Sequence, residues 1–186
     1  DGLETGETAE FNPCWTKGTN NSTAYPYPYS TNAVSGERSL YFYGYRSSTT
    51  TYYSYAALPL MQDSVKNLSL SFNVRRYSTI TDGYTTRLVI GVMTDPADIA
   101  TFFPMDTLDL KTADALSVHG YEFFFNNYTG NGQYIAIYDA VPPLYGTATT
   151  CYSYAYVDDI LVDHIPSCVR PTNVAASTIG ETTATL

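Results

Sequence analysis

Two adjacent acidic residues near the end of the chain, Asp158 and Asp159 in the stretch YVDDILVD, are the first place where chemistry could be built. Residues spaced by two along a strand point to the same side, so Asp158 is expected to share a face with Tyr156, Ile160 and Val162. A carboxylate on an apolar face needs compensation from a cation or from hydrogen-bond donors. The pattern therefore predicts a carboxylate-centred site that holds strands together.

Residues suited to catalysis follow no recognisable arrangement. The two histidines, His119 and His164, lack the spacing of a metal-binding pair, and the chain contains no H-E-x-x-H, G-x-S-x-G or phosphate-loop motif. Sugar hydrolases with a sandwich fold use paired carboxylates, but Glu4, Glu7 and Glu10 have the wrong period for carboxylates on one strand face. The sequence therefore predicts that the protein is not an enzyme.

Tyrosine is the residue type that most favours a binding role. The chain has 19 Tyr, many of them in the runs YPYPY, YFYGY and TYYSY. Tyrosine offers a flat amphipathic surface at low entropic cost, which suits contacts with sugars or proteins. Tyr52, Tyr53 and Tyr55 are the expected ligand-binding residues because they fall in a Ser/Thr-rich loop. The alternative is that they are ordinary exposed tyrosines of a β-sheet.

Charge and hydropathy exclude several classes of partner. The 186 residues include 18 acidic and 9 basic residues, which gives a net charge of -9. Nucleic acid and anionic membrane surfaces are not expected as partners, because binding phosphates needs clustered Lys and Arg. No run of 18 apolar residues occurs, so no membrane insertion is expected.

The elements that must position these residues are expected to be strands. Leu68, Leu70, Phe72 and Val74 alternate with polar residues, which indicates a half-buried strand. Residues 87–93 follow a turn that contains Asp-Gly, and this predicts an antiparallel hairpin with the preceding strand. Further strands are expected over residues 40–45, 121–126, 133–138 and 154–163. The pattern predicts an all-β fold, a two-sheet antiparallel sandwich.

The last residues differ from the rest and resemble the start of a fibronectin type III domain. Residues 171–174 match its P-x-N-V/L opening, and residues 181–186 match its T-x-T-x-A-T-L continuation. The expected organisation is one module over residues 1–168, followed at 169–186 by a linker and the truncated start of such a domain. Neighbouring domains of a longer chain are then expected partners. The alternative is a simple C-terminal tail.

Residues 1–168 also resemble a known group of modules, through short motifs spread along them. In chain order they are LETGE, NPCW, SGERSLYF, LSLSF, GVMTDPADIATF and YVDDILVDHIPSC. This order resembles that of the jelly-roll modules of secreted bacterial multidomain proteins, which are related to MAM domains and to cleaved-adhesin domains of bacterial surface proteases. The resemblance implies a jelly-roll β-sandwich, a secreted or cell-surface location, and non-catalytic adhesion to a glycan or protein ligand. A structural spacer beside a catalytic domain is the rival function.

The same resemblance implies a structural calcium ion. Its ligands would be Glu4 from the opening strand, Asp158 and Asp159 from the closing strand, and backbone carbonyls of residues 35–39. Such a mixture of oxygen ligands suits Ca²⁺. The alternative is that Asp158 accepts hydrogen bonds from backbone groups or pairs with Arg38.

The resemblance also implies a disulfide between Cys14 and Cys168, because the corresponding segments meet at the start of the first strand. Cys151 would then be a free and partly buried thiol. A bond between Cys14 and Cys151, or three reduced cysteines, are the alternatives.

Overall fold

The structure is a computed structural model that describes residues 13–22, 24, 26–31, 33–76, 84–85, 87–110, 117–141, 149–167, 178–179 and 184–185. Over these residues the regular elements are strands, apart from two short 3-10 helices, η1 (Val65–Asn67) and η2 (Ile99–Thr101). No helix in these ranges is long and apolar enough to cross a membrane. The strands are β1 (Thr16–Thr19), β2 (Tyr27–Tyr29), β3 (Ser39–Ser47), β4 (Thr51–Tyr52), β5 (Ser54–Ala57), β6 (Leu68–Arg76), β7 (Tyr84–Thr85), β8 (Arg87–Met93), β9 (Phe103–Asp109), β10 (His119–Phe124), β11 (Tyr134–Asp139), β12 (Thr150–His164), β13 (Thr178–Ile179) and β14 (Ala184–Thr185).

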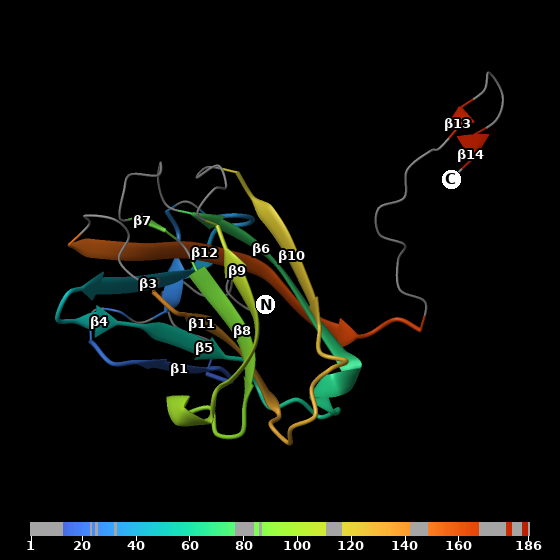
Figure 1. Ribbon diagram of the computed structural model, residues 1–186, viewed down its shortest axis with the longest axis horizontal. Helices are drawn as coiled ribbons and strands as arrows, with labels where there is room; N and C mark the ends of the chain where they lie inside the picture. The colour runs from blue at the N-terminus through green and yellow to red at the C-terminus, as the bar shows by residue number, and fades with distance from the viewer. Residues whose placement is uncertain are drawn as a thin grey trace.

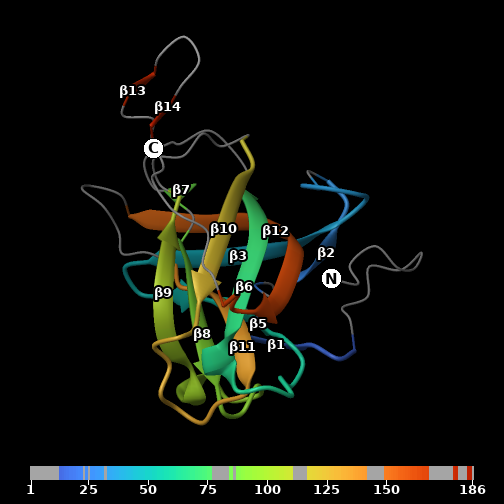
Figure 2. The ribbon, with the colours of Figure 1, turned by 90° about the vertical axis from the view of Figure 1, so that its right-hand side faces the viewer.

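The strands form two packed sheets (Figures 1 and 2). The five-stranded sheet has the order β1-β5-β11-β8-β9, and the seven-stranded sheet has the order β10-β6-β12-β3-β2, with β4 beside β3 and β7 beside β12. The pairs are antiparallel except that of β7 with β12. The predicted all-β, two-sheet antiparallel sandwich of the jelly-roll kind is therefore confirmed.

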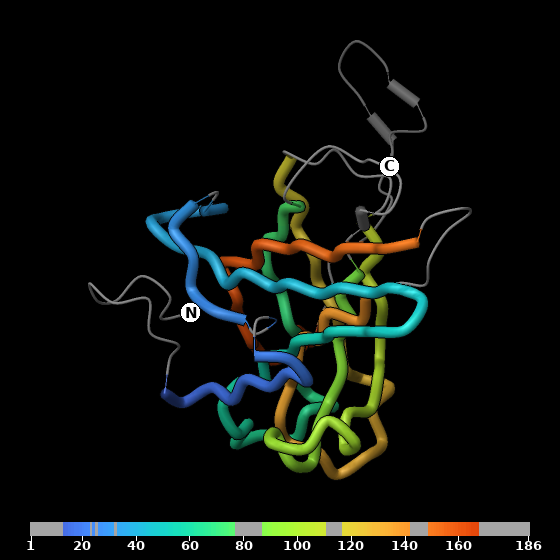
Figure 3. The backbone as a smooth tube through the Cα atoms, turned by 90° about the vertical axis from the view of Figure 1, so that its left-hand side faces the viewer, coloured from blue at the N-terminus to red at the C-terminus, as the bar shows by residue number. Residues whose placement is uncertain are grey.

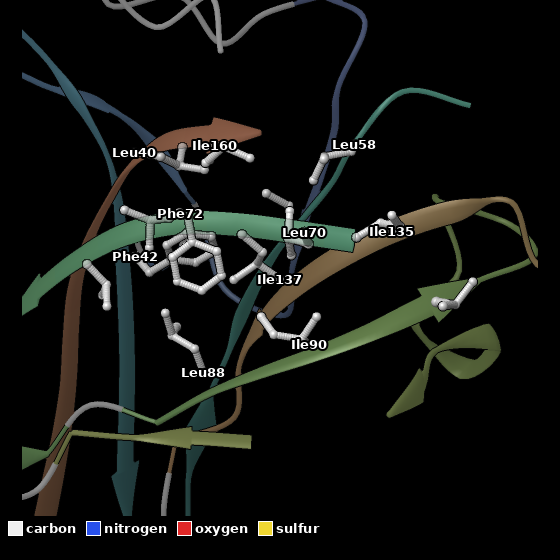
Figure 4. Packing of buried hydrophobic residues seen from close by; sticks show 14 of the residues in the cluster. Leu40, Phe42, Leu58, Leu70, Phe72, Leu88, Ile90, Ile135, Ile137 and Ile160 are labelled. Atoms are coloured by element: carbon white, nitrogen blue, oxygen red, sulfur yellow. The ribbon is translucent and has the colours of Figure 1, made fainter. Parts of the chain in front are cut away.

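The core lies between the two sheets because each central strand turns alternate apolar side chains inward (Figure 4). In β6 the inward side chains are those that the sequence pattern predicts, from Leu68 to Val74. Burying one such side chain contributes about 1.5–3 kcal/mol. The side chains labelled in the figure come from both sheets: Leu40, Phe42, Leu58, Leu70, Phe72, Leu88, Ile90, Ile135, Ile137 and Ile160.

The predicted hairpin between β6 and β8 is wrong. β6 pairs with β10 and β12, whereas β8 pairs with β9 and β11 in the other sheet. An Asp-Gly dipeptide marks a turn, but a turn of this length also lets the chain cross from one layer of a sandwich to the other. Residues 77–83 and 86, which connect the two strands around β7, lie outside the described residues.

One end of the core contains a buried carboxyl group, that of Asp139 in β11. The residue has 0% exposure, and neither carboxyl oxygen has a hydrogen-bond partner among the residues that the structure describes. Gly44 of β3 leaves it room, since a Cβ at Gly44 would lie 3.0 Å from Oδ2. Burial raises the pKa of Asp139 to about 7, and the nearby Ser153 hydroxyl moderates the rise although its geometry falls short of a hydrogen bond.

In the C-terminal segment the structure describes only the backbone of β13 and β14, which pair antiparallel. The boundary at residue 168 and the fibronectin type III start at 169–186 stay predictions.

Candidate functional site

The paired acids lie at a bulge in β12, where the register against β6 shifts just after Asp158. Asp159 has a left-handed backbone with φ 52°, a conformation that Asp adopts more readily than most residues. The inserted residue inverts the alternation, because Val157 before the bulge and Ile160 after it both belong to the core, with Val162 packed against them. The prediction that Asp158 shares a face with Ile160 and Val162 is therefore wrong.

Asp158 instead faces the outer side of the seven-stranded sheet, under the segment that leads into β3. It is 1% exposed. Its Oδ2 accepts hydrogen bonds from the backbone N–H of Ser35 and the hydroxyl of Ser39, both at 2.9 Å, and its Oδ1 accepts one from the backbone N–H of Asp159 at 2.9 Å. Hydrogen-bond donors therefore compensate the buried carboxylate, as the hydrogen-bonding alternative predicts.

Asp159 is held by the same surroundings. Its Oδ2 accepts a hydrogen bond from the side-chain amide of Asn73 at 2.8 Å, and its Oδ1 accepts one from the Ser35 hydroxyl at 2.7 Å. These two bonds, that of Asn73 first, lower the pKa of Asp159.

The donor set around the two acids decides how well a cation fits. The surrounding groups are N–H and O–H donors, which suit a carboxylate better than they suit Ca²⁺. Over the described ranges no group of three or more His, Cys, Asp or Glu could hold a metal ion. Glu4 lies outside those ranges. The calcium site of Glu4, Asp158 and Asp159 therefore stays a prediction.

The cysteines are placed in part. Cys151 is a buried free thiol in β12, so the alternative bond between Cys14 and Cys151 is wrong. Burial raises the pKa of the Cys151 thiol, with Arg46 opposing the rise. Cys14 is exposed, and Cys168 lies outside the described residues, so the Cys14–Cys168 bond stays a prediction.

The outer face of the seven-stranded sheet carries a set of mutually contacting tyrosines, which we call the tyrosine array. It spans β2, β3, β4 and β12, and the last of these runs side by side with β3 (Figure 3). The cross-strand pairs Tyr27 with Tyr41, Tyr41 with Tyr156, Tyr43 with Tyr154, Tyr45 with Tyr152 and Tyr45 with Tyr52 place the rings on one side. The array consists of Tyr27, Tyr29, Tyr41, Tyr43, Tyr45, Tyr52, Tyr152, Tyr154 and Tyr156.

Ring contacts fix the side chains of the array relative to one another. Tyr154 lies at its centre, with ring centroids 5.3 Å from Tyr43, 6.0 Å from Tyr152 and 6.3 Å from Tyr41. Tyr156 is buried beneath the others, whereas the remaining rings are half-buried and keep part of their surface in water. Burial raises the pKa of Tyr41, with neighbouring tyrosines adding to the effect, so its phenol is uncharged at neutral pH. The array is a preorganised surface of aromatic rings and phenol hydroxyl groups.

The three tyrosines singled out in the sequence do not lie together. Tyr52 belongs to the array, through its contact with Tyr45, and Tyr53 packs against Tyr138 at the five-stranded sheet. Tyr55 is 3% exposed, and its hydroxyl donates to the carbonyl of Pro96. A ring this deeply buried cannot contact a ligand, so the prediction for Tyr55 is corrected; Tyr52 and Tyr53 stay predictions.

A polar groove adjoins the tyrosine array on the same face of the sheet, between β6 and β10. It has a volume of about 350 Å³, near the lower end of the range for ligand pockets. We call it the β6–β10 groove. The polar residues and the glycine that line it are Ser71, Asn73, Gly120, Glu122 and Asp159.

The two histidines lie at opposite ends of β6, His119 opposite Val74 and His164 opposite Leu68. His164 forms an exposed pair with Asp63 at 3.2 Å. The histidines therefore cannot act on one substrate together.

Solved structures with the same fold are known. The chain superposes on the K1 cleaved adhesin domain of Lys-gingipain from Porphyromonas gingivalis with a TM-score of 0.60 and 12% identity, over 88% of this chain and 96% of that domain. For the K2 cleaved adhesin domain of Lys-gingipain the TM-score is 0.56, with 11% identity over 85% of this chain and 93% of that domain. A structure described for carbohydrate-binding modules of the β-sandwich superfamily gives 0.50 and 15%, over 86% of this chain and 63% of that one. The resemblance to cleaved-adhesin jelly rolls is thus confirmed at the level of the fold.

No protein-family model and no curated protein matches the sequence.

Proposed function

We propose that this chain is a non-catalytic binding module of a secreted or cell-surface protein, and that the tyrosine array binds a glycan. The observation that carries the proposal is a contiguous set of half-buried tyrosine rings on one open face of the sandwich. Such rings stack on the apolar faces of sugars, and their hydroxyl groups exchange hydrogen bonds with sugar hydroxyls. The cleaved-adhesin and carbohydrate-binding folds described above are consistent with this role.

The array favours binding over a purely structural role. A spacer domain needs no preorganised aromatic surface, and large exposed apolar or aromatic patches are uncommon on monomeric domains without a partner. The rings already contact one another, so a ligand pays little conformational entropy to order them.

The test is affinity gel electrophoresis of the whole chain in gels that contain soluble neutral polysaccharides, namely hydroxyethyl cellulose, galactomannan and xylan. We expect at least one of them to retard the protein. Tyr154→Ala should weaken retardation by roughly tenfold or more, because central aromatic residues dominate binding. Tyr134→Ala, on the five-stranded sheet, is the matched control and should behave like the parent. An unretarded parent, or equal effects of the two variants, would refute glycan binding by the array and favour the spacer or a protein ligand.

Hydrolysis is disfavoured by the acids of the β6–β10 groove. A glycosidase needs one carboxyl group that stays protonated, which burial usually provides. Hydrogen bonds from Asn73 and Ser35 lower the pKa of Asp159, so this carboxyl group is unsuited to the role of the protonated acid. Incubation with the same polysaccharides should release no reducing ends; release that Glu122→Gln abolishes would identify an enzyme.

We also propose, from the resemblance of the sequence, that Glu4 joins Asp158 and Asp159 in holding a structural calcium ion. The Ser35 hydroxyl lies within hydrogen-bond distance of both closing-strand carboxylates, and this shared contact supports the proposal. Calcium should raise the melting temperature of the parent above that in EDTA, because a ligand of the folded state stabilises it. The increase should be lost in Glu4→Gln. An identical melting temperature with and without calcium would refute the calcium site.

A further inference from the structure

We propose that the β6–β10 groove is a subsite for an uncharged sugar unit at the end of a glycan whose other units contact the tyrosine array. This inference rests on the proposed function. It adds where one sugar unit binds and which kind of sugar that unit is.

The register of the seven-stranded sheet places the groove on the same outer face as the array. Tyr156 of β12 pairs with Arg75 of β6, and the next outward pair along the strands is Asp158 with Asn73. Asn73 in turn pairs with Gly120 of β10. The groove therefore begins one row from the edge of the array. Ser35 lies over Asp158 between them, so a ligand that contacts both would pass over the exposed Ser35.

The groups that line the groove match the hydrogen-bonding capacity of a sugar. Ser71 and Glu122 form a cross-strand pair on the outer face, so a hydroxyl and a carboxylate face the same space. Asn73 supplies an amide, which already donates one hydrogen bond to Asp159. Sugar hydroxyls both donate and accept, and a mixed set of donors and acceptors satisfies both functions.

The charges of the groove select against acidic sugars. Glu122 and Asp159 both line it, and no Lys or Arg is among its lining residues in the described structure. A uronate or sulfate group would place a further negative charge beside these carboxylates, within a chain of net charge -9. A hydroxyl group of a neutral sugar instead donates to them.

Gly120 keeps the groove open and offers a way to close it. A Cβ at this position would meet only Asn73 Oδ1, at 3.6 Å, which is an ordinary contact. The backbone of Gly120 lacks a positive φ, so a larger residue is compatible with the strand. Its side chain would project into the groove from the exposed face of β10.

The experiment compares Gly120→Leu with Thr107→Leu in the polysaccharide gels described above, with a polyuronate gel added. Thr107 is an exposed strand position on β9, in the other sheet, and serves as the matched control. Gly120→Leu should bind the retarding neutral polysaccharide roughly tenfold more weakly, whereas Thr107→Leu should bind like the parent. The parent should be retarded less by polyuronate than by the neutral polysaccharide.

The outcomes separate this inference from the proposed function. If Tyr154→Ala abolishes binding while Gly120→Leu binds like the parent, the array binds glycan and the groove is not a subsite. Stronger retardation by polyuronate would also overturn the inference. If Gly120→Leu shows a changed circular dichroism spectrum, Glu122→Gln replaces it in the test. We expect Glu122→Gln to lose affinity roughly threefold, because an amide is a weaker acceptor than a carboxylate. An unchanged affinity would mean that no ligand occupies the groove. A parent that no polysaccharide retards overturns both proposals.

Discussion

The buried carboxyl group of Asp139 predicts an unusual dependence of stability on pH. Its pKa is about 7 in the folded state against an ordinary value of 3.8. Between these values the folded state binds more protons than the unfolded state, so stability falls as pH rises from about 4 to about 7 and is level above that. The gap corresponds to about 4 kcal/mol of unfolding free energy, as an upper limit.

The variant Asp139→Asn isolates this effect, because the amide has nearly the same shape and cannot ionise. Urea unfolding of parent and variant should be followed from about pH 4 to about pH 8. We expect the parent and the variant to have similar unfolding free energies at the acidic end of this range. At the alkaline end the variant should be the more stable of the two.

The background from the many other carboxylates is removed by taking the difference between parent and variant at each pH. Thr107→Leu serves as the control, since Thr107 is exposed and does not ionise, and its difference from the parent in unfolding free energy should be constant across this range. A constant difference for Asp139→Asn as well would refute the reasoning, because it would mean that the carboxyl group finds water or a partner in the folded protein.

Three further predictions concern named side chains. Replacing Asp158 with Ala should lower the unfolding free energy by about 2–4 kcal/mol, because the donors around it lose their acceptor; Asp63→Ala, at the surface, should cost less than about 1 kcal/mol in the same urea titration. Gly44→Ala should cost roughly 1–3 kcal/mol, since a Cβ there would collide with Val141, and an unchanged melting temperature would contradict the packing described. The Cys151 thiol should be inert to a thiol reagent in the native protein and react after denaturation; prompt reaction of the native protein at this residue, read by mass spectrometry, would show that it is accessible.

Strands with a clear alternation were predictable from the sequence, and the proline-containing edge strands β2 and β9 were not. The apolar positions of β6 follow a period of two, and the bounds of β8 agree with the predicted 87–93. β2 and β9 contain Pro28 and Pro104, which argue against a strand, yet each strand lies at the edge of its sheet. Proline is tolerated there because the outer side of an edge strand needs no ladder hydrogen bond.

The candidate site was less predictable because it depends on register between distant strands. The array joins Tyr41 to Tyr156, and nothing local indicates that these two residues are opposite one another. The YSYAY run at 152–156 carried a usable signal, since tyrosine at every second position of a strand lines one face. The bulge at Asp159 has no signal of its own in the sequence, so the sequence predicts an unbroken alternation through it.

That bulge also explains how one long strand contributes tyrosines to the outer face along its first part and an apolar side chain to the core after Asp159. Before Asp159 the outward positions of β12 supply tyrosines to an open surface; after it the core receives Ile160. If β12 kept Asp159 but ran straight without the bulge, the two-residue period would carry Ile160 out into water and bring Leu161, now 56% exposed, inward. The bulge, as much as the composition of β12, therefore sets which of its side chains face the core and which face outward.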